Sequence, residues 1–167
     1  LVAGHGCASV AEQAAKISGV SKVLLVEAEA YENFLAENVA SLISNISGDY
    51  DFILAPTTTN GKNVMPRVAA LQDVSQISDI SAIESNDTFQ RPIYAGNCIA
   101  TVKTSDTKKI ITVRTTAFDP ADATSGSAEI ITLEEINDAG ISKFLKEEIA
   151  ESDRPELTAA EVIISGG

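Results

Sequence analysis

Apolar residues follow two alternating patterns along the first half of the chain, one typical of buried strands and one of amphipathic helices. Near-continuous apolar runs occupy residues 1–4, 22–27 and 51–56, the composition of strands covered on both faces of a sheet. Between these runs, apolar residues recur at helical spacing over residues 9–18 and 34–46. Strands and helices joined by short connections predict an α/β layer with a parallel sheet and right-handed crossovers.

Local signals mark the ends of these helices. Ser9 and Glu12 have the spacing of a capping box at the start of the first helix, and Gly19 stands at its expected end. Gly48 follows the second helix, and apolar spacing predicts a third helix over residues 64–71.

The pattern changes after about residue 82. Apolar and polar residues alternate over 98–103, 109–115 and 128–133, which predicts half-exposed strands, antiparallel ones among them. The small and polar stretch 118–127 predicts a surface loop, and residues 137–150 carry apolar side chains at helical spacing. The expected fold is thus α/β, with a mainly parallel sheet, helices on both faces and some antiparallel strands in the second half.

The last part of the chain differs in composition from the rest. Residues 151–160 are polar and contain proline, as a linker does, and residues 161–167 form an apolar run that ends in glycines. We therefore expect an α/β domain over 1–150, a linker, and the first strand of another domain, with the chain truncated at both ends. Residues 134–161 are strongly acidic, which is typical of a solvated face and also compatible with a docking surface.

Composition excludes several classes of function but does not identify one. The 167 residues carry a formal net charge of −12, which disfavours a nucleic-acid partner, and no apolar stretch approaches the length that a membrane span requires. Two distant cysteines and a single histidine form neither a disulfide framework nor a metal site. We expect a chain that is not membrane-embedded and is poorly equipped for catalysis.

A turn between the third strand and the third helix is the first candidate site. Thr58, Asn60, Gly61 and Lys62 lie where a helix start could bind an anion at the carboxyl end of a parallel strand. The turn lacks the glycine and hydroxyl positions of a phosphate-binding P-loop. Helix capping and a tight turn are the alternative reading.

A second set of candidates consists of side chains suited to interfaces. Arg91, Tyr94 and Asn97 accompany one strand start, and Arg114 follows another strand. Each could contact a neighbouring domain or serve inside this one. Asp79 could cap a turn or pair with one of the arginines. His5 next to Cys7 could suggest an activated nucleophile, but a loop histidine beside a small buried cysteine is the simpler interpretation.

Taken in order, several segments resemble one family, the amino-terminal domain of the alpha subunit of electron transfer flavoprotein. The matching segments span nearly the whole chain: residues 1–4, 60–63 with 66–70, 77–80, 93–97 with 101–103, 113–118, and 152–158 with 165–167. The resemblance implies a Rossmann-like fold of the adenine nucleotide alpha hydrolase type. It also implies that the first strand and helix of the domain precede Leu1.

The resemblance further implies an electron carrier and not an enzyme. Family members are heterodimers with a beta subunit that take electrons from acyl-CoA dehydrogenases and other flavin dehydrogenases, as in fatty acid beta-oxidation. They pass them through one FAD to electron transfer flavoprotein quinone oxidoreductase, in the bacterial cytoplasm or the mitochondrial matrix. The FAD would be held by a carboxyl-terminal domain beginning near Glu161, and AMP by the beta subunit alone, so no cofactor-binding or catalytic residue is assigned here. Two alternatives stay open: a nucleotide-binding regulatory module, and a hydrolase built on Cys7 and His5.

Overall fold

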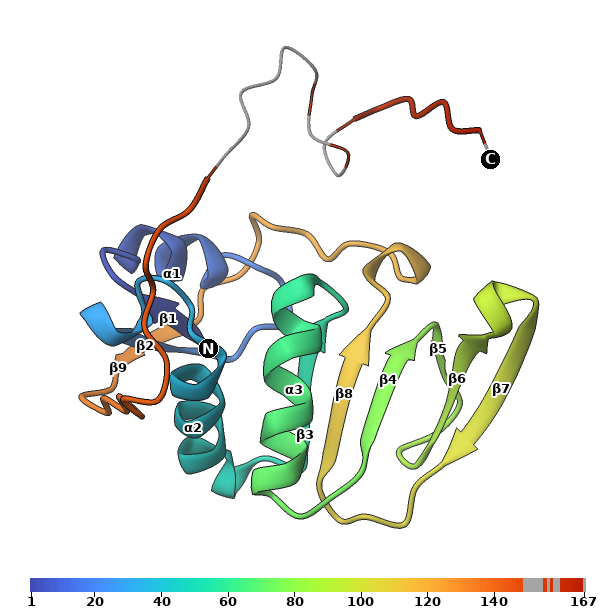
Figure 1. The fold of residues 1–167 in the computed structure, drawn as a ribbon, viewed down its shortest axis with the longest axis horizontal. Coiled ribbons are helices and arrows are strands. Elements are labelled where there is room, and N and C mark those ends of the chain that lie inside the picture. Colours follow the sequence, from blue (N-terminus) through green and yellow to red (C-terminus); the bar gives the residue numbers. More distant parts are fainter. Residues whose placement is uncertain (149–154, 156, 158–159, 167) are drawn as a thin grey trace.

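A computed structural model describes residues 1–148, 155, 157 and 160–166, and within them the chain forms three three-stranded sheets and three α-helices (Figure 1). The first sheet is parallel and has the order β1 (Val2–Gly4), β2 (Lys22–Glu27) and β9 (Glu129–Thr132). The second, also parallel, has the order β3 (Phe52–Pro56), β8 (Lys109–Val113) and β4 (Gln76–Ile80). The third is antiparallel and contains β5 (Ala82–Ile83), β6 (Thr88–Ile93) and β7 (Cys98–Lys103).

Helices cover both faces of the first sheet, as the apolar pattern predicts. α1 (Ala8–Ala14) packs on one face of β2 through Ala11, which contacts the cluster containing Val23 and Leu25. α2 (Ala36–Ile46) and α3 (Thr59–Leu71) pack on the other face, where Val26 is completely buried. The apolar residues of β2 therefore alternate between two different helix layers, which explains its continuous apolar sequence.

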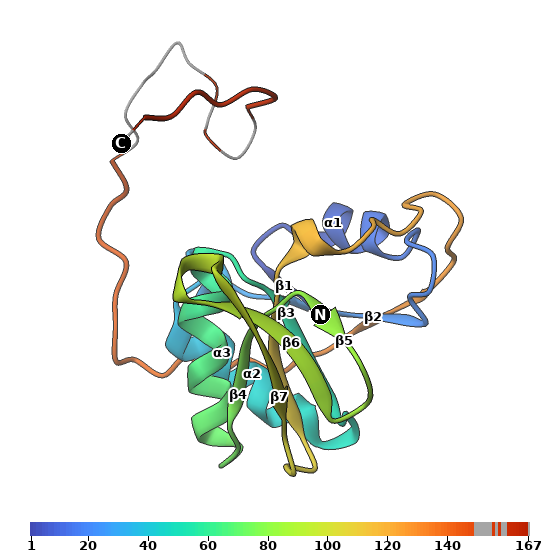
Figure 2. The ribbon, with the colours of Figure 1, turned by 90° about the vertical axis from the view of Figure 1, so that its right-hand side faces the viewer.

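The antiparallel sheet covers β4 and β8 of the second sheet on one face. Phe89 of β6 is buried against Ile111 of β8 and Ile77 and Ile80 of β4. β6 lies next to β4 (Figure 1), and a view from that side shows β6 and β7 in front of the second sheet (Figure 2). The expected antiparallel strand over 98–103 is confirmed, and β6 pairs with it along its whole length.

Two local expectations for the second half are wrong. The strand over 109–115, which was expected to be half-exposed, is β8, and it is buried in the middle of its sheet, where it runs parallel to β3 and β4. The strand over 128–133 is β9, which runs parallel to β2. Strand β8 is thus packed on both sides, although its sequence alternates like a half-exposed strand. The helix expected over 137–150 is absent from residues 137–148, which run as an extended segment, and its last two residues lie outside the described part of the chain.

The first helix begins differently from the sequence prediction. It starts at Ala8, ends at Ala14 before Gly19, and no side chain of its own caps it. Instead, the Glu27 carboxylate accepts hydrogen bonds from the backbone N–H groups of Cys7 at 2.7 Å and Ala8 at 3.1 Å. A residue distant in sequence therefore replaces the predicted capping box. Residues 160–166 are not paired as a strand here, and the domain boundaries near residues 150 and 160 stay predictions.

Candidate functional site

An ion pair joins the ends of β4 and β8, where the second sheet meets solvent. Arg114 directly follows β8, and its N–H donates to the carbonyl of Ile80 at 3.0 Å. Its guanidinium donates twice to Asp79, from Nε to Oδ1 at 3.3 Å and from Nη2 to Oδ2 at 2.5 Å. Asp79 has a left-handed backbone with φ +57°, and its N–H donates to the Thr112 hydroxyl at 2.8 Å. Hydrogen bonds of the two backbone N–H groups therefore hold both residues in position for the contact between their side chains.

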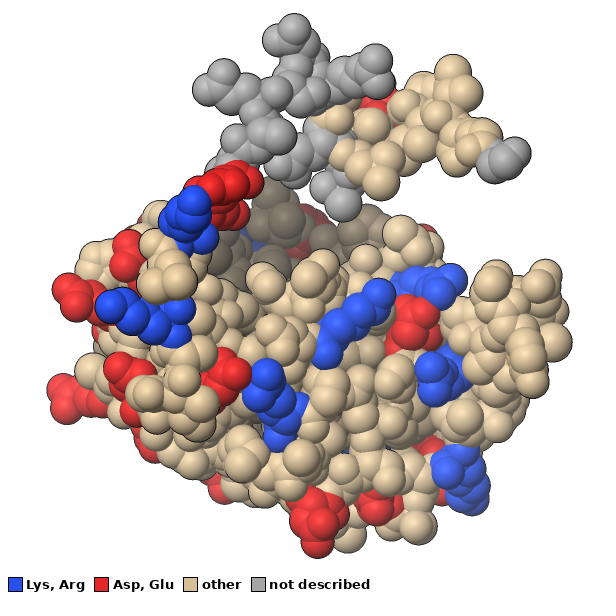
Figure 3. Space-filling view, viewed as in Figure 1, with Lys and Arg blue, Asp and Glu red and all other residues tan. Residues whose placement is uncertain are grey.

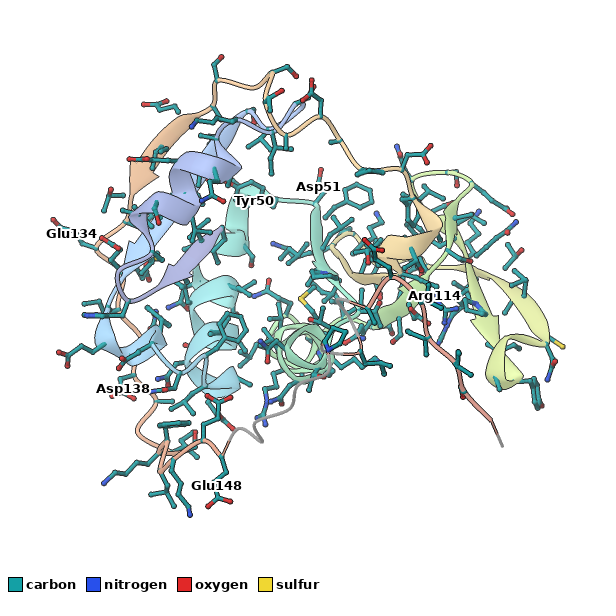
Figure 4. All side chains as sticks on the ribbon, turned by 90° about the horizontal axis from the view of Figure 1, so that it is seen from above. Tyr50, Asp51, Arg114, Glu134, Asp138 and Glu148 are labelled. Carbon is teal, nitrogen blue, oxygen red and sulfur yellow. The ribbon has the colours of Figure 1, made fainter. Side chains whose placement is uncertain are left out.

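The sequence suggested Arg91 or Arg114 as a partner for Asp79, and the structure shows that the partner is Arg114. The Arg114 hydrogen bonds lower the pKa of Asp79 below its ordinary value, and the same contact raises the pKa of Arg114. The Arg114 side chain remains 45% exposed, so part of its planar donor fork still faces solvent. In the view from above, Arg114 lies on the side of the second sheet, away from Asp138 and Glu148 (Figure 4).

The other three interface candidates lie on the antiparallel sheet. Arg91 is half-buried in β6, and its Nε is buried without a hydrogen-bond partner among the described residues. Tyr94 is 79% exposed and has φ +50°, and Asn97 is exposed close by at the β6–β7 connection. No hydrogen bond or ion pair between described residues links any two of the four candidates. The four candidates therefore lie in two separate places: Arg114 at the end of β8, and the other three on the antiparallel sheet.

Of the four candidates for an anion site, Asn60, Gly61 and Lys62 lie in the first turn of α3, which begins at Thr59 and thus earlier than predicted, and Thr58 is its N-cap residue. The Thr58 hydroxyl accepts from the Gly61 N–H at 3.2 Å and caps the helix, and the Thr58 carbonyl accepts from the Lys62 N–H at 2.9 Å. Gly61 is required because a Cβ there would stand 2.0 Å from the Pro56 carbonyl oxygen. Asn60 and the Lys62 side chain are exposed. The helix start is therefore occupied by its own cap, which favours the structural reading over an anion site.

Cys7 has the properties of a structural thiol. Burial and then the nearby Glu27 carboxylate raise the pKa of the Cys7 thiol, the opposite of what an activated nucleophile needs. His5 is exposed at the preceding turn, and φ at Gly6 is +63°. These observations support the simpler interpretation of this pair over the hydrolase hypothesis.

A contact set that the sequence did not reveal holds residues 135–142 against α2; we call this segment the strap. Buried Asn38 accepts a hydrogen bond from the Ala139 N–H at 2.9 Å, and the Tyr31 hydroxyl accepts one from the Asn137 N–H at 2.8 Å. Ser142 donates to Glu37 at 2.9 Å. These partners are about one hundred residues apart in sequence, so no local pattern could have predicted them.

The described residues do not fit a flavin. A cavity of about 590 Å³ is lined mainly by apolar side chains, and Lys22 is the only lysine or arginine among its lining residues. The helix start beside this cavity is closed by the Thr58 cap and the tight Pro56–Gly61 contact. The described residues also contain no group of three His, Cys, Asp or Glu side chains that could hold a metal. No α-helix in this part of the chain has the length and apolar character of a membrane span.

Comparison with known proteins shows to which protein family the chain belongs. The electron transfer flavoprotein domain family matches residues 1–138. Over the whole chain, the sequence is 58% identical to the electron transfer flavoprotein subunit alpha of Pseudomonas aeruginosa and 53% identical to that of Paracoccus denitrificans. It is 45% identical to the mitochondrial subunit alpha of Dictyostelium discoideum. These matches cover 54%, 54% and 51% of the three relatives.

The family match covers most of the chain, and the α/β fold is consistent with it. The chain therefore belongs to the electron transfer flavoprotein family. The relatives that it resembles are alpha subunits of electron transfer flavoprotein. The chain spans about half the length of the curated relatives it matches.

Proposed function

We propose that the chain is the amino-terminal scaffold domain of an electron transfer flavoprotein alpha subunit. In this proposal the whole alpha subunit pairs with a beta subunit and carries electrons through one FAD. The donors are acyl-CoA dehydrogenases and other flavin dehydrogenases, and the acceptor is a quinone oxidoreductase. The FAD is held outside residues 1–160, and AMP belongs to the beta subunit. The bacterial and mitochondrial relatives support a bacterial cytoplasm or mitochondrial matrix as the compartment.

The observation that carries this proposal is the 58% identity to an alpha subunit over all 167 residues. The matched region covers all 167 residues and therefore every element of the fold. Side chains without a metal, a redox dithiol or a bound cofactor do not store electrons at biological potentials, so a domain of this composition serves the flavin by supporting its neighbours.

The surface supports contact through a few specific side chains. Lysines and arginines over α3 and towards the third sheet are interspersed with acidic residues on the face of Figure 3, so this face presents no broad patch of one sign. Arg114 is partly exposed and directly follows β8, and Tyr94 is largely exposed and directly follows β6. Arginine and tyrosine are the residue types that dominate interface energies. We assign Arg91, Tyr94, Asn97 and Arg114 to contacts with the FAD-binding domain or the beta subunit.

Substitution in the full-length heterodimer tests the contact assignment. Arg114→Ala and Tyr94→Ala are expected to weaken heterodimer assembly or to lower FAD retention, measured by size-exclusion chromatography and visible flavin absorbance. Loss of a central interface arginine typically weakens binding by about tenfold or more. Arg67→Ala is the matched control, because Arg67 is also 45% exposed and paired with a glutamate that is 22% exposed. If all three variants assemble and hold FAD equally, the contact assignment is wrong.

The isolated chain tests the scaffold role itself. Purified residues 1–167 are expected to show no visible flavin absorbance after incubation with FAD and gel filtration, because the described residues build no flavin pocket. The full-length heterodimer is the positive control. Stoichiometric flavin retained by the isolated chain would contradict the proposal.

A further inference from the structure

A polar pocket lies between the second sheet and the antiparallel sheet, where β4 begins and β7 leads into β8. Its volume is about 290 Å³, at the small end of the range of ligand pockets, which is about 300–1,000 Å³. The residues that begin β4 line one side of it, and residues 102–106 line another. Both segments lie at the same end of their sheets (Figure 1). A pocket of this size suits a small ligand and not a dinucleotide.

Backbone hydrogen bonds hold the walls of this pocket in place. The Ser75 N–H donates to Oδ2 of Asp106 at 3.0 Å, which joins the β7–β8 connection to the start of β4. The Asp106 N–H donates to the Thr104 hydroxyl at 3.1 Å, and the Thr104 N–H donates to the Asp87 carbonyl at 2.9 Å. The pocket is therefore formed by contacts within this domain.

Arg91 contributes a buried donor to the pocket. It lies in β6 two residues after Phe89, so both side chains are on the face that packs against the second sheet. The Arg91 Nε is buried and has no hydrogen-bond partner among the described residues, and no ion pair between described residues includes Arg91. Because a guanidinium stays charged, leaving its buried N–H without an acceptor costs free energy.

The other two charged residues that line the pocket, Lys103 and Asp106, have partners. Lys103 Nζ pairs with Oδ2 of Asp87 at 3.2 Å, and its side chain is 72% exposed. The Asp106 carboxylate accepts from the Ser75 N–H. Arg91 is therefore the charged lining residue without a partner among the described residues, which favours an anionic ligand with oxygen acceptors.

Gln76 adds a buried acceptor to the same pocket. Its Nε2 donates to the Ser78 hydroxyl at 2.9 Å, and its Oε1 is buried without a donor among the described residues. A ligand that satisfies both Arg91 and Gln76 needs oxygen acceptors and a hydroxyl donor. At neutral pH, sulfate and simple carboxylates offer acceptors alone, whereas inorganic phosphate keeps a P–OH group.

We propose that this pocket binds inorganic phosphate in its hydrogen phosphate form. Arg91 donates from Nε to a phosphate oxygen, and Oε1 of Gln76 accepts from the P–OH group. The hydroxyl groups of Thr104 and Ser105, which also line the pocket, supply further donors. Arg91 was assigned above to a contact with a neighbouring domain, but phosphate binding in this pocket requires no such contact.

Isothermal titration calorimetry on the full-length heterodimer is the first test. The heterodimer is used with its FAD and AMP in place, so that phosphate cannot enter their sites. Inorganic phosphate is expected to bind saturably, with one ion per alpha subunit. Sulfate has a similar shape but no hydroxyl donor, and it is expected to bind at least about tenfold more weakly. Absence of saturable phosphate binding, or equal binding of sulfate, would overturn the proposal.

Arg91→Met tests the position of the phosphate. The substitution keeps much of the apolar stem but removes the guanidinium, and it is expected to weaken phosphate binding at least about tenfold. Arg67→Met is the control, because Arg67 lies on α3 outside the pocket lining, and it is expected to leave phosphate binding unchanged. Phosphate binding that is the same in Arg91→Met and the parent protein would place the ion elsewhere and refute the proposal.

Gln76→Met separates the pocket from the subunit contacts. Gln76 is not among the residues assigned to those contacts, so the variant is expected to assemble and hold FAD like the parent protein. It is expected to lower the affinity for phosphate to that for sulfate, because the acceptor for the P–OH group is lost. This variant tests the pocket even if Arg91→Met fails to assemble. An undiminished preference for phosphate over sulfate in Gln76→Met would contradict the proposal.

Discussion

At the residue scale, helix ends in this protein are stabilised by groups that the local sequence does not indicate. The Glu27 carboxylate accepts from two backbone N–H groups at the start of α1, where a negative charge also interacts favourably with the helix dipole. At the other end of α1, the Gly126 N–H donates to the Lys16 carbonyl at 2.7 Å. A helix of seven residues is short enough to depend on such external contacts.

Glu27→Ala is therefore expected to lower the free energy of unfolding by about 1 kcal/mol, the usual cost of removing a helix cap. Urea denaturation followed by circular dichroism measures this change in the free energy of unfolding. Ser9→Ala is the control, because Ser9 occupies the position of the predicted capping box but makes no cap bond. If Ser9→Ala lowers the free energy of unfolding as much as Glu27→Ala, the predicted capping box is supported and the Glu27 cap is not the main contact.

Gly61 gives a second residue-scale prediction. Gly61→Ala is expected to lower the free energy of unfolding by about 3 kcal/mol, because the new methyl group would overlap the Pro56 carbonyl and push α3 away from β3. Gly48→Ala places a methyl group where no heavy atom lies within 4 Å and is expected to change stability little. Similar melting temperatures for both variants would show that the turn relaxes without cost.

The Asp79–Arg114 pair predicts a pH dependence. Arg114 lowers the pKa of Asp79 in the folded state below its ordinary value of 3.8, so the pair stabilises the fold above that value. The contribution is lost as pH falls through the lowered pKa and Asp79 becomes protonated. Arg114→Gln is expected to be less stable than the parent chain near neutral pH, and this difference is expected to shrink at an acid pH at which Asp79 becomes protonated. A stability difference that is the same at both pH values would exclude the pair as its cause.

At the element scale, the sequence predicted those elements whose signals are local. β2, α2 and β3 appear close to their expected positions because hydrophobic spacing within each segment reflects its own burial, and α3 ends as expected at Leu71 but begins earlier than expected, at Thr59. β8 was misjudged because its burial depends on inserting between β3 and β4, two strands of other segments. The Asp79–Arg114 contact was left open for the same reason, since 35 residues separate the partners.

The strap shows how tertiary contacts override a helical pattern. Residues 137–148 have apolar residues at helical spacing, but Asn38 and Tyr31 bind the backbone N–H groups of Ala139 and Asn137. Gly140 follows with φ +61°, a conformation that a continuing helix does not contain. Hydrogen bonds from buried partners therefore hold the segment extended.

Asn38→Leu is expected to release the strap. The substitution removes the acceptor for the Ala139 N–H and the donor to the Ala30 carbonyl, and it should cost about 2 kcal/mol of stability. Hydrogen exchange over residues 135–142 should become faster, while exchange in β8 stays the same. Asn86→Ser, at an exposed position, is the control. Unchanged exchange in the strap would show that Asn38 does not hold it.

At the scale of the whole molecule, the helix layer connects the two parallel sheets. No strand pairing links β1 to β3 among the described residues, whereas α2 and α3 contact both sheets through one apolar cluster. The cooperativity of this chain therefore depends on the helix layer. A side chain in the middle of that layer has more influence on global unfolding than an equally large side chain at its rim.

Leu42 in α2 is such a side chain, fully buried in the shared cluster, whereas Leu71 at the end of α3 is 58% exposed. Leu42→Ala is expected to lower the free energy of unfolding by about 3 kcal/mol through lost burial and the cavity left behind. Because the layer joins both sheets, hydrogen exchange should become faster in β2 and in β8 by the same factor. Leu71→Ala should affect neither. Faster exchange in β2 alone would mean that the sheets unfold independently and that the helix layer does not couple them.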